Sequence, residues 1–199
     1  MAEKLTPTEW SKWEPGLNND DLSLGDVYST LPTYEFSSYP LIVLALENPR
    51  SPVALKGKCT LLTHDLIHVL LGRGLYVQDE AFVIGYTMGT SKTIGLVHKS
   101  IFKFAAHYLY PKKYRFTEVD LRVFDTAFFL GQLNRIEIFN APLPELMHRK
   151  LGELRKIFNI DKELLRLIFH MEAKSFDTRA SKRLRASFEK NPKRSAEAA

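Results

Sequence analysis

Apolar residues recur along this chain with the period of helices. From residue 36 onward they return every three or four positions or fill whole turns, and no run alternates with the period of two that marks a half-buried strand. The pattern predicts helices over residues 36–48, 51–72, 79–111 with a break near 89–91, 117–139, 143–158 and 162–176. Such a series of elements is typical of an all-α protein.

Residues that begin or end helices stand at the borders of these segments. Gly72 is a natural helix stop. Asp79 can act as the N-cap of the next helix, which leaves Glu80 in the first turn. The stretch Thr117–Asp120 has the form of a capping box, and Asp161 can cap the last helix before that helix frays into a basic tail.

The predicted architecture is a compact helical domain around one central, buried helix, the second in the series, which is apolar on nearly all sides. Residues 1–35 are rich in Pro, Asn, Asp, Ser and Thr and predict an irregular N-terminal arm, pinned to the core by Trp10 and Trp13. We place the helical domain at residues 36–160. A C-terminal helix and a basic, helical C-terminal tail form residues 161–199.

Composition and charge add two points. The 199 residues are 45% apolar and 26% charged, as in an ordinary globular protein. The net charge of the chain is +5. Residues 174–194 alone have a charge of +6, so the rest of the chain is close to neutral.

The single cysteine, Cys59, excludes an internal disulfide and fits a reducing compartment. It lies well round the predicted helix from His64, so we expect it to be an inert packing residue. With no signal or transit peptide visible, we expect an intracellular protein.

A polar cluster interrupts the most apolar helix. His64 and His68 are four residues apart, and Asp65 precedes His68 by three, so all three side chains can point at one spot. Burying three polar groups without partners would cost roughly 1–3 kcal/mol each. A divalent cation would remove that cost by binding neutral imidazole nitrogens and a carboxylate.

Glu80 completes the candidate site. It follows His68 after eleven residues and a glycine-bearing turn, and the first turn of an antiparallel neighbouring helix can reach back to the same spot. Two imidazoles and two carboxylates suit a borderline metal, with Zn first and Fe(II), Mn or Co as further candidates. We therefore predict His64, Asp65, His68 and Glu80 as metal ligands, and as catalytic residues if a coordination position is open.

Three other interpretations share part of this pattern. The two histidines could simply hydrogen-bond, but Asp65, the apolar surroundings and Glu80 favour a metal. HD phosphohydrolases also carry His-Asp but need a histidine upstream, and none precedes His64. Zinc proteases use His-Glu-x-x-His with the glutamate as general base, where this chain has Asp65. A metal-dependent hydrolase remains an alternative.

The stretch "HDLIHVLLGRGLYVQDE", residues 64–80, resembles the signature of the coenzyme Q (ubiquinone) biosynthesis protein 4 family, which is His-Asp-x-x-His, eleven residues, Glu. A weaker similarity lies at "PLPELMHRKLGELRKIFNI", and the resemblance covers roughly residues 36–160. The chain departs from the family pattern at Asp79, where the family usually has glycine before the glutamate.

The resemblance implies a metal-dependent carboxy-lyase that removes the C1 carboxylate from a prenylated hydroxybenzoate at a membrane surface. Its ligands would be His64, Asp65, His68 and Glu80. It also implies a polyprenylated quinone precursor and other quinone-biosynthesis enzymes as partners, and a homodimer is compatible with it. The alternative is a non-catalytic scaffold that binds prenyl lipid and holds a structural metal.

Two further features bear on partners. Gly85, Gly89 and Gly95, with the aromatic residues that follow them, predict either a groove for an isoprenoid chain or tight helix packing. The basic tail, 174–194, either lies on anionic lipid or is a merely solvated, partly disordered end. Nucleic acid is disfavoured because few aromatic residues interleave the cations. We therefore expect a peripheral protein on the cytoplasmic face of a membrane.

Overall fold

Helices are the regular elements of this protein. The computed structural model describes residues 11–32 and 59–189, and these ranges contain no β-strand, which confirms the all-α prediction. The α-helices are α1 (Leu24–Tyr28), α3 (Leu61–Leu71), α4 (Val77–Thr90), α5 (Leu96–Phe104), α6 (Glu118–Asn134), α7 (Leu151–Ile157), α8 (Lys162–Ser175) and α9 (Arg179–Glu189). Shorter pieces are the π-helical η3 (Ala105–Leu109) and the 3₁₀-helical η4 (Ile138–Asn140) and η5 (Leu143–Leu146).

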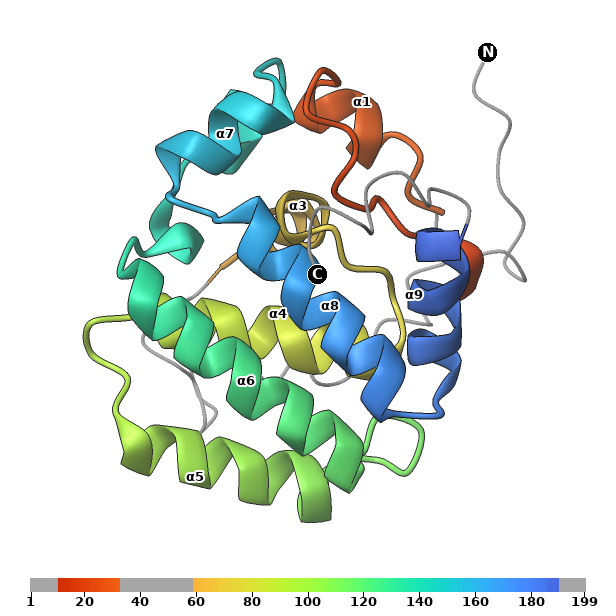
Figure 1. Cartoon of the computed structure of the whole chain (residues 1–199). Helices are drawn as coiled ribbons and strands as arrows, with labels where there is room; N and C mark the ends of the chain where they lie inside the picture. The colour runs from red at the N-terminus through yellow and green to blue at the C-terminus, as the bar shows by residue number, and fades with distance from the viewer. Residues whose placement is uncertain (1–10, 33–58, 190–199) are drawn as a thin grey trace.

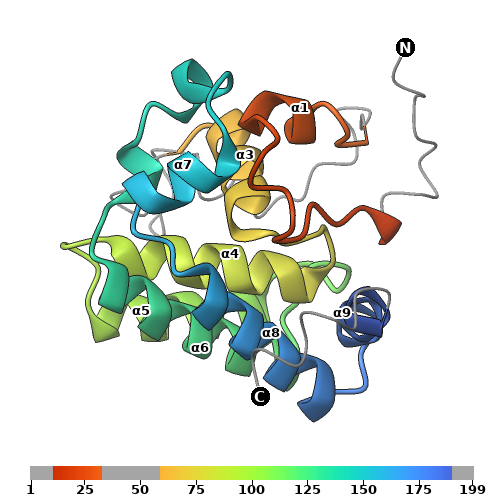
Figure 2. The same ribbon diagram turned by 45° about the horizontal axis from the view of Figure 1, so that its top comes forward.

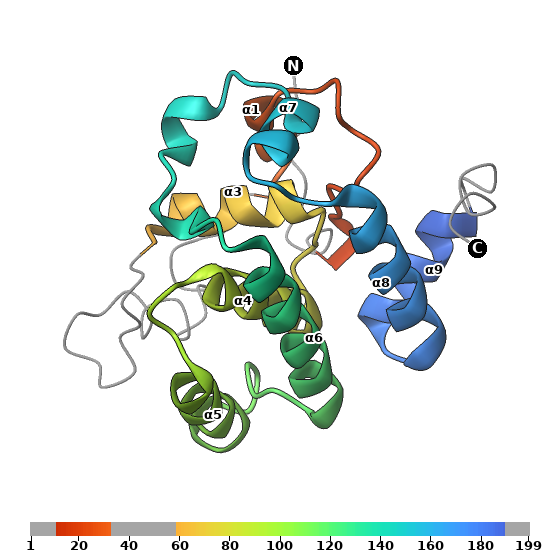
Figure 3. The same cartoon turned by 60° about the vertical axis from the view of Figure 1, so that its left-hand side comes forward.

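The helices are arranged around α4. Helices α4 and α6 pack along each other, and α5 lies beyond α6 at the end of the molecule farthest from α1 and α7 (Figure 1). Helix α3 runs between α4 and the α1–α7 end (Figure 3). Helix α8 crosses α4, and α9 follows α8 at the side of the molecule (Figure 2).

Glycines allow α4 and α6 to approach closely. A Cβ added at Gly85 or Gly89 would overlap a backbone carbonyl oxygen of α6, and one added at Gly131 would overlap a carbonyl oxygen of α4. A Cβ at Gly95 would meet nothing within 4 Å. For Gly85 and Gly89 the structure therefore supports the helix-packing interpretation over the groove.

Two apolar clusters form the core. The larger one joins α1, α3, α7 and α8 with one side of α4, and the smaller one fills the space between α4, α5 and α6. Trp13 belongs to the larger cluster, is 6% exposed and donates from Nε1 to Thr30 Oγ1 at 3.0 Å. The arm is therefore pinned at Trp13 as predicted, whereas Trp10 lies outside the described residues.

Several predicted helix ends are confirmed. Gly72 ends α3 with a left-handed φ of 70°. Helix α4 stops at Thr90, inside the expected break. Thr117 and Asp120 form the capping box of α6, and the Asp161 carboxylate accepts the Leu164 N–H at the start of α8.

Other predictions were wrong in detail. The central helix, predicted to run through residues 59 and 60, begins only at Leu61, with Thr60 as its N-cap. The predicted start of this helix and the helix over 36–48 lie outside the described residues and stay predictions. Tyr76, not Asp79, occupies the N-cap position of α4, because Asp79 sits one turn further in and accepts the Tyr76 N–H. Helix α6 ends at Asn134, since Arg135 is left-handed.

The segment 143–158 is not one helix. Its middle, residues 147–150, is a turn that ends in a single β-bridge between Lys150 and Ser23. There Gly25 N–H donates to Met147 O at 2.7 Å and Leu24 N–H to Arg149 O at 2.9 Å. These bonds order part of the arm around α1, which the sequence did not indicate. The C-terminal segment does not fray after α8 either, because α9 buries Leu184 against the core.

Among the described residues, every helix is too short or too polar to cross a membrane.

Candidate metal centre

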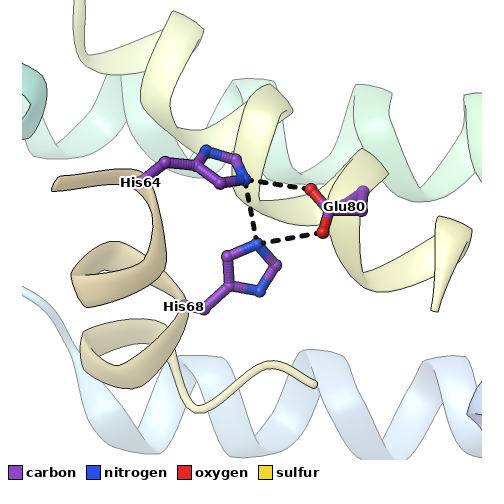
Figure 4. Close-up of side chains that lie close together, drawn as sticks. All are labelled: His64, His68 and Glu80. Carbon is purple, nitrogen blue, oxygen red and sulfur yellow. Dashed lines mark hydrogen bonds and ion pairs between the residues drawn. The ribbon is translucent and has the colours of Figure 1, made fainter. Parts of the chain in front are cut away.

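Helix α3 presents the two histidines of the candidate site. The Thr60 side chain accepts the Thr63 N–H at 3.1 Å and fixes the first turn, so the helix is regular where His64 begins its second turn. The four-residue spacing then brings His64 and His68 to the same side, with their Nε2 atoms 3.1 Å apart. Figure 4 shows both imidazoles directed away from α3 toward α4.

Glu80 reaches this pair from α4. It lies in the first turn of that helix, after the turn through Gly72 and Gly74, and points back at the histidines (Figure 4). Its Oε2 lies 3.0 Å from His64 Nε2, and its Oε1 lies 3.4 Å from His68 Nε2. If one possible ligand atom is taken from each of the three residues, these atoms all lie within 4.8 Å of one another.

A backbone contact sets the tautomer of His68. Its Nδ1 lies 2.8 Å from Gly74 O, and a carbonyl oxygen can only accept, so Nδ1 carries the proton. The Nε2 lone pair therefore faces the site. His68 is fully buried, and an imidazole fixed by a carbonyl at its far nitrogen is the usual arrangement of a metal-binding histidine.

Without a metal, the side chains of His64, His68 and Glu80 share a proton. Burial opposes a charge on His64, but hydrogen bonds with Cys59 and Glu80 and the negative charge of Glu80 hold the pKa of His64 well above its ordinary value. Burial likewise opposes ionisation of Glu80, yet the nearby imidazoles His68 and His64 lower the pKa of that carboxyl. A proton on His64 Nε2 thus occupies the position where the three ligand atoms converge, and a divalent cation can replace it.

Asp65 does not join the converging group. It is half-buried on α3, about 100° round the helix axis from His64. The structure thus brings together three of the four predicted residues, two histidines and Glu80, and places Asp65 at the side. Within residues 11–32 and 59–189, the same three residues make up the one group of His, Cys, Asp and Glu side chains with metal-binding geometry.

Cys59 was misjudged from the sequence. Because α3 starts only at Leu61, Cys59 lies before the helix. The direction of its side chain therefore does not follow from the rotation per residue of a helix. Its thiol is close enough to hydrogen-bond His64 and helps to raise the pKa of that imidazole. The Thr60-x-x-Thr63 pair, an N-cap with its partner, is the sequence signal that could have placed the helix start after Cys59.

A second polar cluster, which we call the arginine network, adjoins the site. Both oxygens of Asp79 lie 2.8 Å from Arg183 Nη2 of α9, and Arg73 Nη2 lies 2.6 Å from Glu172 Oε2 of α8. Gln78 also donates to Glu172, at 2.5 Å. These contacts hold the turn between α3 and α4 and so fix where Gly74 O and Glu80 stand.

Comparisons with family models, with curated proteins and with solved structures found no match to this chain. The resemblance of residues 64–80 to a quinone-biosynthesis family therefore stays a prediction.

Proposed function

We propose that the chain is a metal-dependent enzyme whose divalent cation is held by His64, His68 and Glu80. The observation that carries the proposal is the convergence of two imidazole nitrogens and a carboxylate at one buried spot. A set of three protein ligands leaves coordination positions for water and substrate, which is typical of catalytic sites. Two histidines and a glutamate suit Zn, and they also suit Fe(II), with Mn or Co as further candidates.

The reaction that we propose is the decarboxylation of a prenylated hydroxybenzoate, as the resemblance of residues 64–80 implies. A bound cation would supply Lewis-acid stabilisation of the carboxylate or phenolate. When the bond between the ring carbon and the carboxylate breaks, carbon dioxide leaves and the electron pair stays on the ring, which then takes up a proton. Glu80 and the Gly74 carbonyl, through His68, would keep the ligand atoms oriented during this step.

An assay of product formation tests this reaction. Protein purified without chelator is incubated with a prenylated hydroxybenzoate, and loss of the carboxyl group is followed by mass spectrometry. We expect turnover by the wild type and none by His68→Ala or Glu80→Ala. The exposed His148→Ala serves as a matched histidine control and should keep full activity. Turnover that persists in both ligand variants would contradict the proposal.

A structural metal is the second candidate. The three side chains bridge α3 and α4 and are at most 17% exposed, which also suits a cation that ties two helices together in a non-catalytic scaffold. A structural metal should take the fold with it when a ligand is lost. Cooperative unfolding of Glu80→Ala at temperatures where the wild type is folded would favour the scaffold, and a folded but inactive variant would favour the enzyme.

A further inference from the structure

One face of α5 and η3 is apolar and open to solvent. Val97, Ile101, Phe104 and Tyr108 recur at spacings of four, three and four residues, so they form one stripe along the helix. Each of them is between 51% and 70% exposed. The π turn of η3 also leaves Leu109 69% exposed beside Tyr108, which widens the stripe at its end.

The opposite face fixes how α5 is oriented. Phe102 is 1% exposed and stacks on Phe124 of α6, with ring centroids 5.0 Å apart. Lys99 and Lys103 reach sideways to Asp125 at 2.8 and 2.6 Å. The apolar stripe is therefore held outward, on a helix at the outer end of the molecule (Figures 1 and 3).

The acidic groups beside the stripe, Asp125 and Glu118, face basic side chains of α5 and η3, so the exposed charges left over around it are cations. Residues 81–117 contain no aspartate or glutamate. The exposed cations Lys92, Lys112, Lys113 and Arg115 stand beyond the two ends of α5 and η3, and none of them has an ion-pair partner among the described residues. A surface with an apolar stripe beside cations that have no ion-pair partner suits a binding partner that is both apolar and anionic.

We propose that α5 and η3 lie in the interface of an anionic lipid membrane, with the apolar stripe among the acyl chains and the lysines at the headgroups. Anionic lipid supplies both properties that the surface calls for. A second copy of the chain would bring the same cations together and would be repelled. This surface is separate from the metal centre, and the inference stands without the proposed chemistry.

Vesicle sedimentation tests the inference. The full chain is mixed with phosphatidylcholine vesicles that contain about 30% phosphatidylserine, and its partition coefficient is measured. We expect the double variant Ile101→Glu/Phe104→Glu to lower that coefficient about tenfold or more. The control is Leu167→Glu/Met171→Glu, which adds the same charge to exposed apolar residues of α8 and should bind like the wild type.

A second variant isolates the electrostatic part. Lys112→Glu/Lys113→Glu leaves the stripe intact and should weaken binding to anionic vesicles, with the loss smaller in high salt. Wild-type protein that ignores anionic vesicles would overturn the inference. So would binding abolished by Lys182→Glu/Arg185→Glu in the basic tail but kept by the α5 variants, or a dimer in solution that the stripe variant dissociates. Metal content, measured in every sample, keeps this test distinct from that of the proposed function.

Discussion

Two polar clusters meet at the turn between α3 and α4, and they differ in how their charges are balanced. In the arginine network, the Asp79 and Glu172 carboxylates face arginine guanidinium groups of the same chain. In the histidine cluster, the Glu80 carboxylate faces two imidazoles, one of which is fixed with its lone pair inward. Asp79 and Glu80 are neighbours in sequence, yet the first faces arginines and the second faces a proton on His64 that a divalent cation can replace.

This difference separates a structural role from a functional one. A buried carboxylate that already has its cations can only hold the fold together, and removing one partner leaves the other buried and uncompensated. A group of converging electron donors that is held together by a replaceable proton can act as a ligand set. Substitutions in the arginine network should therefore cause large losses of stability. Substitutions in the histidine cluster should cause loss of the metal.

The largest effect on stability is expected for Glu172→Ala. The substitution leaves Arg73, which is fully buried between Phe82 and Phe169, without its closest carboxylate. Breaking a buried ion pair in this way costs about 3–5 kcal/mol, measurable by urea unfolding. Glu163→Ala, on the same helix but exposed, is the control and should leave the free energy of unfolding nearly unchanged. Equal losses in the two variants would show that the network contributes little.

A smaller loss is expected for Arg183→Ala. Its guanidinium is 12% exposed and contacts both Asp79 oxygens, and hydrogen bonds to charged groups are worth about 1.5–3 kcal/mol. Arg185→Ala removes a neighbouring, more exposed arginine of α9 and serves as the matched control. If thermal melts show the same midpoint for both variants, α9 does not stabilise the turn through Arg183.

The histidine cluster should also make the stability of the protein depend on pH. In chelated protein the raised pKa of His64 gives stability that is fully present below pH 6.5 and is lost as pH rises through that raised pKa. The lowered pKa of Glu80 gives stability that is present above pH 4.5 and is lost as pH falls through it.

With metal the dependence above pH 6.5 should reverse, because the cation needs His64 deprotonated and binds more tightly as pH rises. Thermal melts across this range, with and without chelator, measure both trends. In His64→Gln the loss of stability at rising pH should disappear from the chelated protein. A His64→Gln variant that keeps the wild-type pH profile would show that another group is responsible.

The sequence predicted the helical fold and the position of the site well, because both depend on local patterns. The four-residue spacing of His64 and His68 and the left-handed stop at Gly72 follow from helix geometry alone. The arginine network could not be predicted, since Asp79 meets Arg183 across 104 residues and only tertiary packing joins them. The local position of Asp79 predicts an N-cap, whereas its carboxylate binds an arginine of α9.

The smallest effect is expected for Asp65→Asn. The spacing of Asp65 and His68 predicts Asp65 as a ligand, whereas the structure leaves it outside the converging group. Titration of metal into chelated protein should show a smaller loss of affinity for Asp65→Asn than for Glu80→Gln, which makes the same chemical change in a converging residue. A loss as large as that of Glu80→Gln would return Asp65 to the ligand set.

The central claim is that the histidine cluster binds a cation, and elemental mass spectrometry of protein purified without chelator or metal resin tests it most directly. We predict about one equivalent of Zn, Fe, Mn or Co per chain. It should be absent from His68→Ala and Glu80→Ala and retained by the exposed His148→Ala. A wild type without metal, or ligand variants that keep it, would contradict the claim.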